Sequence, residues 1–449
     1  MSKFDRPRSA PAKTLPSRRG FLGRSIGTIG AAGLAGGISV ARGAHAAGDD
    51  LVKIALIGCG GRGIGAAMNA LSNASHPNVK LVALADAFED RLRFAAEALA
   101  KRVPEKVDVP ADRQFAGLDC FKPIMALDVD LVLLASPPGF RPEQFEAAVD
   151  SGKHVFMEKP VATDAPGVRR IMAANEQAKQ RNLAVAVGHH LRHEVKHREA
   201  IQRIRNGRIG DLKFMRAYFN SSGVWVRPRR PDQTEMQYQV RNWYYFTWLS
   251  GDHIVEQHVH DLDVCNWMAD AVPVEANGMG GRQQRIGKDY GEIFDHHAVE
   301  FIYPGGVKAF SYCRHQQGCW NSFSEHAHGT TGEINIQGHG SAEIQVAGQP
   351  VEVLQRGPDG HQLEHDHLFA ALIAGEPYNE GDYGATSTMT AILGRMATYS
   401  GEIVKWDDAL AATKDLSPAR LAWDAEPKPQ PGPDGLYPAA IPGITKVLS

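Results

Sequence analysis

The chain has 449 residues, 43% of them apolar and 22% charged, which is ordinary for a soluble globular protein and long enough for about two domains. Residues 1–46 hold eight of the 49 Lys and Arg residues and one of the 51 acidic residues, so the remainder carries a formal charge of −9. This balance argues against a nucleic-acid-binding protein, because phosphate contacts need a basic face. It is compatible with a neutral substrate such as a sugar.

The first 46 residues have the pattern of a twin-arginine export signal. Ser17–Leu22 contains the paired arginines, a weakly apolar Gly/Ala-rich run follows to Val40, and residues 44–46 (Ala-His-Ala) offer a cleavage site. The run is too short and too rich in glycine for a membrane span. We therefore expect the twin-arginine export machinery to carry a folded, periplasmic or otherwise exported protein that has no membrane anchor after cleavage. A flexible basic tail is the alternative.

A glycine turn follows the first strongly apolar segment, Val52–Ile57, which has the composition of a buried strand. Its G-x-G-x-x-G spacing is typical of dinucleotide-binding folds, in which the helix after the turn presents its amide groups to the phosphates. A plain glycine-rich loop is the alternative. The residues predicted to lie at the dinucleotide are Gly58, Gly60, Gly61, Arg62 and Gly63.

A second apolar strand, residues 79–86, ends in an acid 23 residues after Gly63. This acid, Asp86, is placed to bind a ribose 2′-hydroxyl, and its charge would repel a 2′-phosphate. The pattern therefore favours NAD over NADP as the cofactor.

Strand and helix patterns alternate from residue 51 to about residue 190, which predicts a doubly wound parallel sheet in an NAD-binding Rossmann domain. Further cofactor contacts are expected at Ser136 and Pro137, after the strand of residues 130–136, and at Glu158 and Lys159, after the strand of residues 154–157. Ligands bind at the carboxyl ends of such strands. A lysine there could stabilise a developing alkoxide, and a surface ion pair is the alternative.

The pattern changes after residue 190, and residues 191–422 are predicted to form an α/β domain for substrate binding and oligomerisation. Its alternating strands indicate a mainly antiparallel sheet packed against helices, including helices over residues 194–206 and 252–269. We expect residues 224–237 to be an irregular loop. The proline-rich tail, residues 423–449, should wrap the surface or make subunit contacts.

The stretch of residues 251–263 is rich in histidine and acid. On one continuous helix, Glu256 and His260 would share a face, and a carboxylate beside an imidazole suits a general base. A surface ion pair is the simpler alternative, and a zinc site built from His253, His258 and His260 is another. No recognised zinc spacing occurs, so we predict no metal.

The five cysteines cannot form a complete set of disulfides, because their number is odd. Cys313 and Cys319 lie close enough in sequence to pair, and the sequence does not settle whether they do.

Together these motifs resemble the Gfo/Idh/MocA oxidoreductases, a family named for glucose–fructose oxidoreductase and inositol dehydrogenase. The glycine turn, Asp86, the Ser136-Pro137 turn, Glu158-Lys159-Pro160 and the pattern Glu256-x-x-x-His260-x-x-Asp263 occur in the family order. The resemblance implies a Rossmann domain followed by an open-sheet α/β domain, and a homo-oligomer built on that sheet.

The resemblance also assigns roles. It implies that His260 is the acid/base, that Glu256 orients His260 or relays its proton, and that Lys159 polarises the reacting hydroxyl. The family often has Asp where Glu256 stands and Gly where His258 stands, which weakens the relay role of Glu256. Substrate contacts are expected, with less support, at Arg141, His190, Arg241, Trp243 and His258. Core packing of the tryptophans and solvated charge for the arginines are the alternatives.

Three functions remain open at this point. The leading hypothesis is an exported oxidoreductase that moves hydride between tightly bound NAD and a hydroxyl of a sugar or sugar derivative, because free NAD is scarce outside the cytoplasm. The second is a redox-neutral glycosidase that uses bound NAD catalytically through oxidation, elimination, hydration and re-reduction. The third is a sugar sensor without catalysis.

Overall fold

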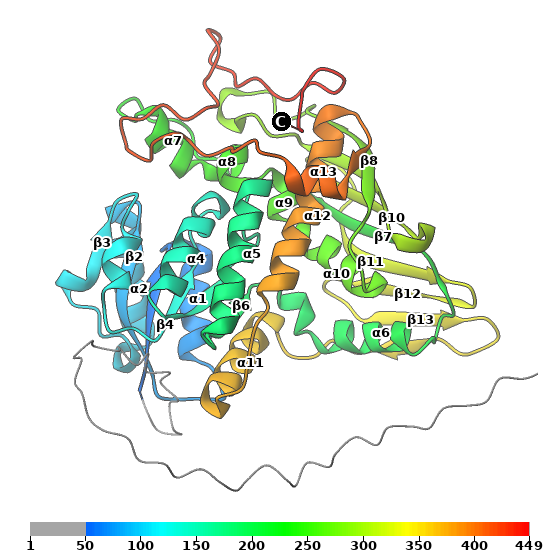
Figure 1. Cartoon of the computed structure of the whole chain (residues 1–449), viewed down its shortest axis with the longest axis horizontal. Coiled ribbons are helices and arrows are strands. Elements are labelled where there is room, and N and C mark those ends of the chain that lie inside the picture. The colour runs from blue at the N-terminus through cyan, green and yellow to red at the C-terminus, as the bar shows by residue number, and fades with distance from the viewer. Residues whose placement is uncertain (1–50, 449) are drawn as a thin grey trace, which may run out of the picture. The chain divides into compact units, whose positions relative to one another are not determined.

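The protein is described by a computed structural model that covers residues 51–448 (Figure 1). The predicted export signal lies outside the described residues. Two sheets, one of six strands and one of nine, organise the described chain. Between residues 51 and 448, the helices include none with the length and apolar character that crossing a membrane requires.

The six-stranded sheet is parallel throughout, in the order β3-β2-β1-β4-β5-β6. Its central strands are buried on both faces, as their continuous apolar runs predict. The strands are β1 (Val52–Ile57), β2 (Val79–Asp86), β3 (Gln114–Ala116), β4 (Leu131–Leu134), β5 (His154–Met157) and β6 (Val185–Val187). The helices among them are α1 (Gly61–Leu71), α2 (Glu89–Arg102), α3 (Phe121–Met125), α4 (Arg141–Asp150) and α5 (Ala165–Gln180).

The nine-stranded sheet is antiparallel except where β7 and β10 pair in parallel, as the mainly antiparallel prediction expects. Its order is β14-β13-β12-β11-β7-β10-β9-β8-β15. The strands are β7 (Leu212–Ser221), β8 (Glu275–Gly281), β9 (His296–Ile302), β10 (Lys308–His315), β11 (Ser322–Gly329), β12 (Gly332–Gln337), β13 (Ala342–Val346), β14 (Glu352–Leu354) and β15 (Val404–Lys405). The remaining helices are α6 (Val195–Arg205), α7 (Glu235–Arg241), α8 (Thr247–Ser250), α9 (His253–Glu256), α10 (Val259–Ala269), α11 (Gly360–Ala374), α12 (Gly381–Ser400) and α13 (Trp406–Ala411).

Helix α12 joins the packing of the two sheets. It contacts α5 of the parallel sheet on one side and α10, β8 and β9 on the other (Figure 1). Nearly every residue of α12 is buried, which explains why it is rich in small and apolar side chains all round. One hydrophobic core therefore runs from the parallel sheet into the second half of the chain.

The continuous helix predicted for residues 252–269 is wrong. The helix stops at Glu256 and restarts at Val259, which separates α9 from α10. In an unbroken helix the amide of His260 would donate to the carbonyl of Glu256. Here that carbonyl accepts from Lys159 Nζ at 2.6 Å, and the His260 amide donates to Gln257 at 3.4 Å. Because of this break, Glu256 and His260 belong to different helices and do not share a helix face.

Several elements were missing from the sequence prediction, and two of them show why. Helix α7 begins inside the predicted loop, where Thr234 and Gln237 form a capping box that the surrounding prolines and arginines hide. Strand β11 is polar, with the sequence SFSEHAHG, and lacks the alternation of apolar residues that identifies a strand. It is fixed by pairing with β7 and β12.

All five cysteines are free thiols, so Cys313 and Cys319 do not pair. The tail after Trp423 contains no helix or strand within the described residues. It is nevertheless packed, because Trp423 lies against Phe88 with 5.2 Å between ring centroids and Tyr437 is buried.

Candidate active site

The glycine turn between β1 and α1 is shaped by close backbone contacts. Gly58 has φ of +98°, and a Cβ there would lie 2.3 Å from the amide nitrogen of Ser136. A Cβ on Gly63 would lie 1.9 Å from the carbonyl oxygen of Gly58. These two positions therefore accept only glycine.

The other two glycines face open space. A Cβ on Gly61 would meet nothing within 4 Å, and one on Gly60 would meet only the guanidinium of Arg91 at 3.7 Å. Their lack of a side chain is therefore not required by the protein's own packing. It leaves room for a ligand to approach the backbone at the start of α1, as a pyrophosphate does.

A cavity of about 360 Å³ opens at this turn, at the carboxyl edge of the parallel sheet where the strand order reverses. The predicted cofactor residues that line it are Gly58, Gly60, Gly61, Arg62, Gly63, Asp86, Ser136 and Pro137. Residues from three separate loops, after β1, β2 and β4, thus meet at one cavity. The amide groups at the start of α1 and the carboxylate of Asp86 fit the pyrophosphate and ribose of a dinucleotide.

Asp86 lies at the end of β2 and lines the cavity, although only 7% of it is exposed. One carboxylate oxygen accepts the amide of Cys59 at 2.7 Å, and the other accepts the amide of Phe88 at 2.8 Å. Burial raises the pKa of Asp86, and these two amide donors act in the opposite direction. The carboxylate is thereby fixed in the position that the fingerprint assigns to ribose binding.

Arg62 connects the cavity to the Glu158-Lys159 motif. Its guanidinium binds the buried carboxylate of Glu158 and, at 3.1 Å, that of Glu364 on α11. Burial alone would raise the pKa of Glu158, but the charges of Arg62 and Lys159 outweigh it and hold that pKa low. Glu158 thus sits between the cavity and the lysine that follows it.

Lys159 is held at the end of β5 by Glu256. Its Nζ donates to the main-chain carbonyl of Glu256 at 2.6 Å and to the Oε1 of the same residue at 3.1 Å. Only 11% of the Lys159 side chain and 10% of the Glu256 side chain are exposed. The structure therefore pairs Glu256 with Lys159, where the sequence had suggested a partnership with His260.

His260 lies in the first turn of α10 and is one of several histidines whose rings contact one another. Its ring is edge-on to His190, with 4.7 Å between centroids, and also to His189. Burial lowers the pKa of His260 well below its ordinary value, and the positive charge of Lys159 lowers it further. The imidazole is therefore neutral at pH 7 and able to accept a proton.

Two nearby groups were not foreseen in the sequence. His361 of α11 stacks on His190 with 3.9 Å between ring centroids, and no motif marked it. Arg192 binds both carboxylate oxygens of Asp263 at 2.8 and 2.9 Å, which anchors α10 to the residues after β6. Asp263 therefore fixes the position of the helix that carries His260.

Three of the residues predicted to contact substrate, Arg141, Arg241 and His258, have other partners. Arg141 is buried and donates to the carbonyls of Ser136 and Pro160, and burial lowers its pKa to about 10. Arg241 forms an ion pair with Asp90.

The ring of His258 is fully buried between Ser311 and Asp261, so packing is the better interpretation of this residue. Trp243 lines the dinucleotide cavity. His190 is thus the member of this group that lies beside His260.

The histidines proposed as an alternative metal site are not gathered in one place. His253 contacts Asp252, His258 contacts Ser311, and His260 contacts His190. A different buried group, Asp252, His253 and His297, has the spacing of a metal site among the described residues. The carboxylate of Asp252 already accepts from His253, the amide of Phe294 and the hydroxyl of Tyr399, so these hydrogen bonds explain the group without an ion.

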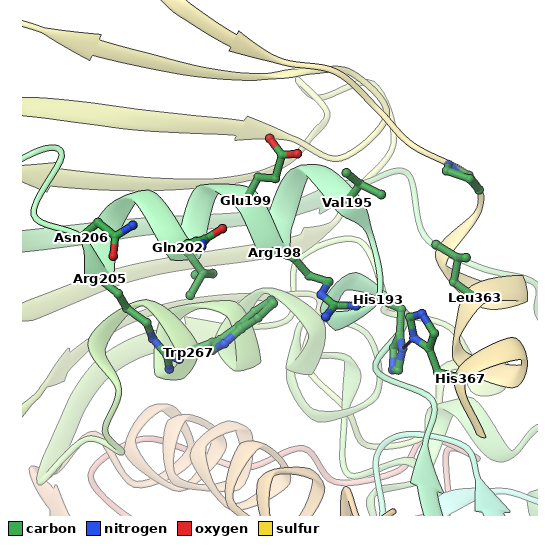
Figure 2. A pocket seen from close by; sticks show the side chains of 12 residues that line it. His193, Val195, Arg198, Glu199, Gln202, Arg205, Asn206, Trp267, Leu363 and His367 are labelled. Carbon is green, nitrogen blue, oxygen red and sulfur yellow. Dashed lines mark hydrogen bonds between the residues drawn. The ribbon is translucent and has the colours of Figure 1, made fainter. Parts of the chain in front are cut away.

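A second, larger cavity of about 690 Å³ lies between α6, α10 and α11 and contains none of the predicted catalytic residues (Figure 2). Its charged side chains, including Arg198 and Arg205, are exposed. His193 and His367 approach each other at its edge, with 2.8 Å between their Nδ1 atoms. We assign no role to it.

The fold and the site together define a protein with a dinucleotide-binding Rossmann sheet joined to a second, mainly antiparallel sheet. The cavity lies at the switch point of the parallel sheet, and Arg62 in its lining binds Glu158, the residue before Lys159.

Comparison with known proteins agrees. Residues 52–189 match the family described as "Oxidoreductase family, NAD-binding Rossmann fold", and residues 197–335 match "GFO/IDH/MocA C-terminal domain". The chain belongs to the Gfo/Idh/MocA oxidoreductase family.

Among individual relatives, the chain is similar to an inositol 2-dehydrogenase of Gluconacetobacter diazotrophicus, with 32% identity over 44% of this chain and 49% of the relative. It is also similar to a 1,5-anhydro-D-fructose reductase of Ensifer adhaerens, with 25% identity over 63% of this chain and 81% of that one. The chain spans about half the length of the first curated relatives that it matches.

Solved structures share the fold. An aldose–aldose oxidoreductase of Caulobacter crescentus complexed with glycerol has a TM-score of 0.63 and 21% identity, over 79% of this chain and 100% of that chain. A levoglucosan dehydrogenase in complex with NADH and levoglucosan also has a TM-score of 0.63, with 16% identity over 79% and 99% of the two chains. The two-sheet architecture is therefore the fold of this family.

Proposed function

We propose that this protein is an exported oxidoreductase that transfers hydride between tightly bound NAD and a hydroxyl of a sugar or sugar derivative. The observation that carries the proposal is the placement of Lys159, held by Glu256, beside the neutral His260 and one residue from the Arg62-bound Glu158. Relatives named as dehydrogenases of inositol and levoglucosan and as an anhydrofructose reductase support a polyhydroxylated substrate.

The chain's own residues divide the work of alcohol oxidation. The amide groups at the start of α1 and Asp86 would hold NAD, which would supply the hydride acceptor for the carbinol carbon. Lys159 donates a hydrogen bond to the reacting oxygen and stabilises its developing negative charge. His260, kept neutral by burial, accepts the hydroxyl proton.

Glu256 fixes the position of this lysine. It accepts from Lys159 Nζ through both its carboxylate and its main-chain carbonyl, which leaves one N–H of the ammonium group for a substrate oxygen. Its second carboxylate oxygen, Oε2, is buried without a hydrogen-bond partner among the described residues. That oxygen can accept a hydrogen bond from a substrate hydroxyl.

The substrate screen that tests the proposal follows the bound cofactor. The full chain is purified without added nucleotide, the nucleotide that it carries is identified, and a panel of sugars, polyols and aryl glycosides is added while absorbance at the NADH wavelength is recorded. Sugar-dependent reduction, reversed by a second sugar or ketone, is the expected result. Aryl-alcohol release without net NADH would replace the oxidoreductase with the NAD-dependent glycosidase, and a protein that binds no NAD would overturn both.

Export and assembly are part of the proposal and have their own tests. Ser17–Leu22 supports twin-arginine export, so replacing Arg18 and Arg19 by Lys should keep a fused reporter in the cytoplasm. One face of the nine-stranded sheet leaves Met279 and Tyr312 exposed, 77% and 38% respectively, which supports a homo-oligomer. Light scattering of the purified protein should give a multiple of the chain mass, and a monomeric mass would exclude it.

A further inference from the structure

A segment between β7 and α8 forms one wall of the dinucleotide cavity. Trp225, Arg227, Val240 and Trp243 line this cavity opposite the glycine turn, although they lie more than 150 residues further along the chain. We call residues 224–243 the cover segment. Within it, the rings of Trp225 and Trp243 meet edge to face, with 5.8 Å between centroids.

The cover segment lies over the adenosine half of the cavity. Asp86 marks the adenosine ribose in this fold, and the loops after β2 and β3 surround the adenine. Those loops contribute Phe88 and Leu118 to the same cavity as the two tryptophans. Arg241, which follows Val240 in the cover segment, lies on the ring of Phe88, so the segment meets the cavity on the side of the loop after β2.

Specific contacts hold the cover segment in place. Arg241 binds both carboxylate oxygens of Asp90, at 2.9 and 2.6 Å, and its guanidinium lies 3.9 Å from the ring centroid of Phe88. On the other side, Asn242 accepts the amide of Arg227 at 2.8 Å and donates to the carbonyl of Asp289 at 2.7 Å. The segment is thus tied both to the Rossmann half and to the second sheet's half of the chain.

The C-terminal tail reinforces this arrangement. Trp423 packs against Phe88, and its carbonyl accepts from the hydroxyl of Thr234 at 2.6 Å, at the start of α7. Phe88 therefore contacts both Arg241 of the cover segment and Trp423 of the tail. Releasing the adenosine half of a bound nucleotide past this wall requires several of these contacts to separate together.

We propose that the cover segment is a retention clamp, in which Trp225 and Trp243 enclose the adenosine moiety and Arg241 locks them to the Rossmann domain. This rests on the proposed function, because it concerns NAD in the same cavity, and it assigns the slow release of that NAD to residues outside the glycine fingerprint. An adenine ring offers a flat π-face, which suits aromatic and guanidinium neighbours. The chemistry is therefore adenosine recognition that is independent of the nicotinamide.

The experiment compares Trp225→Ala/Trp243→Ala and Arg241→Ala with the wild type. Phe94→Ala, an exposed aromatic of α2 outside the cavity, and Arg230→Ala, an exposed arginine of the cover segment, are the matched controls. The release rate of bound NAD is measured by exchange with isotopically labelled NAD, and the affinity of nucleotide-free protein for AMP by calorimetry. A conservative Trp243→Phe variant keeps the test valid if the double variant folds poorly.

We expect NAD release to be on the order of tenfold to a hundredfold faster in the double variant, from the value of base stacking on aromatic side chains. AMP affinity should fall by a similar factor, and both controls should behave as the wild type. Unchanged NAD release, or weaker NAD binding with unchanged AMP binding, would overturn the clamp while leaving the proposed function intact. A wild-type protein that binds neither NAD nor AMP would remove both.

Discussion

The glycine turn makes a prediction in which two neighbouring substitutions have opposite consequences. Gly60→Ala should fold normally, because its Cβ would have only an ordinary contact, 3.7 Å from the Arg91 guanidinium, and its φ of −75° suits any residue. Gly63→Ala should destabilise the protein, because its Cβ would lie 1.9 Å from the carbonyl oxygen of Gly58. Overpacking of this kind costs roughly 1–3 kcal/mol or more.

Binding of the dinucleotide should show the reverse sensitivity. The added methyl group of Gly60→Ala stands where the backbone approaches the pyrophosphate, and one lost hydrogen bond to a charged group costs roughly 1.5–3 kcal/mol, or about 10- to 150-fold in affinity. At a concentration of 100 times the wild-type Kd, NAD stabilises the wild type by about 2.7 kcal/mol, whereas a variant with a 100-fold weaker Kd would gain only about 0.4 kcal/mol.

Denaturant unfolding of nucleotide-free protein, with and without NAD, separates the two effects. The result expected for Gly60→Ala is wild-type stability without NAD and a much smaller gain with it. Gly63→Ala should already be less stable without NAD. Wild-type NAD affinity in Gly60→Ala would refute the assignment of this turn to the pyrophosphate, and wild-type stability in Gly63→Ala would refute the packing of the turn.

Three further predictions concern the reacting groups and pH. Lys159→Met should lower kcat by roughly 10²–10⁴-fold. It should also destabilise the fold by about 3–5 kcal/mol, because it leaves the buried carboxylate of Glu256 unpaired. Steady-state kinetics and urea unfolding measure the two effects, and Lys159→Met/Glu256→Gln should recover stability but not activity. Recovery of activity in the double variant would exclude Lys159 from the chemistry. His260→Asn should lower kcat by roughly 10²–10⁴-fold with nucleotide still bound. The pH profile of the wild-type rate should show no inflection at the ordinary histidine pKa, since the pKa of His260 lies well below it. An inflection of the wild-type profile near the ordinary histidine pKa would contradict this. The fully buried His258 has a pKa lowered to about 3, chiefly by burial. In the unfolded chain this imidazole binds its proton below about pH 6.5, whereas in the folded protein it does so only near pH 3. The free energy of unfolding therefore falls as pH falls from about 6.5 toward 3, by about 2 kcal/mol at pH 5. Urea unfolding at pH 7 and pH 5 measures this. Other buried histidines also have lowered pKa values, so His258→Asn should reduce the difference between the two pH values by about 2 kcal/mol without removing it. An equal pH dependence in that variant would show that His258 does not contribute.

Local motifs carried the Rossmann half of the prediction. The glycine spacing, the acid at Asp86 and the turn after β4 all depend on residues close together in sequence, and their conformations follow from sterics at one turn or one strand end. The alternation of buried strands and amphipathic helices then leaves one topology, because parallel strands need crossover helices of one hand. The side of the cavity formed by the glycine turn, Asp86 and the Ser136-Pro137 turn could therefore be predicted, whereas the wall formed by the cover segment could not.

The second half was harder for physical reasons that particular residues show. Strand β11 is polar and exists because β7 and β12 pair with it, so no local pattern marks it. The break at Gln257 depends on Lys159 taking the Glu256 carbonyl from the helix, a contact between residues 97 positions apart. The sequence suggested Arg141 as a substrate contact, but its guanidinium donates hydrogen bonds to two buried main-chain carbonyls.

The sequence by itself determined the fold class, the dinucleotide turn and the identity of Lys159, Glu256 and His260 as candidate reacting groups. Only the tertiary structure decided their partnerships: Glu256 with Lys159, His260 with His190, and the tryptophans of the cover segment with the cavity at the glycine turn. The reason is that short-range sterics fix a turn, whereas a site assembled across two sheets depends on where distant elements pack. That packing is set by buried surfaces such as α12, whose sequence shows burial but not what lies against it.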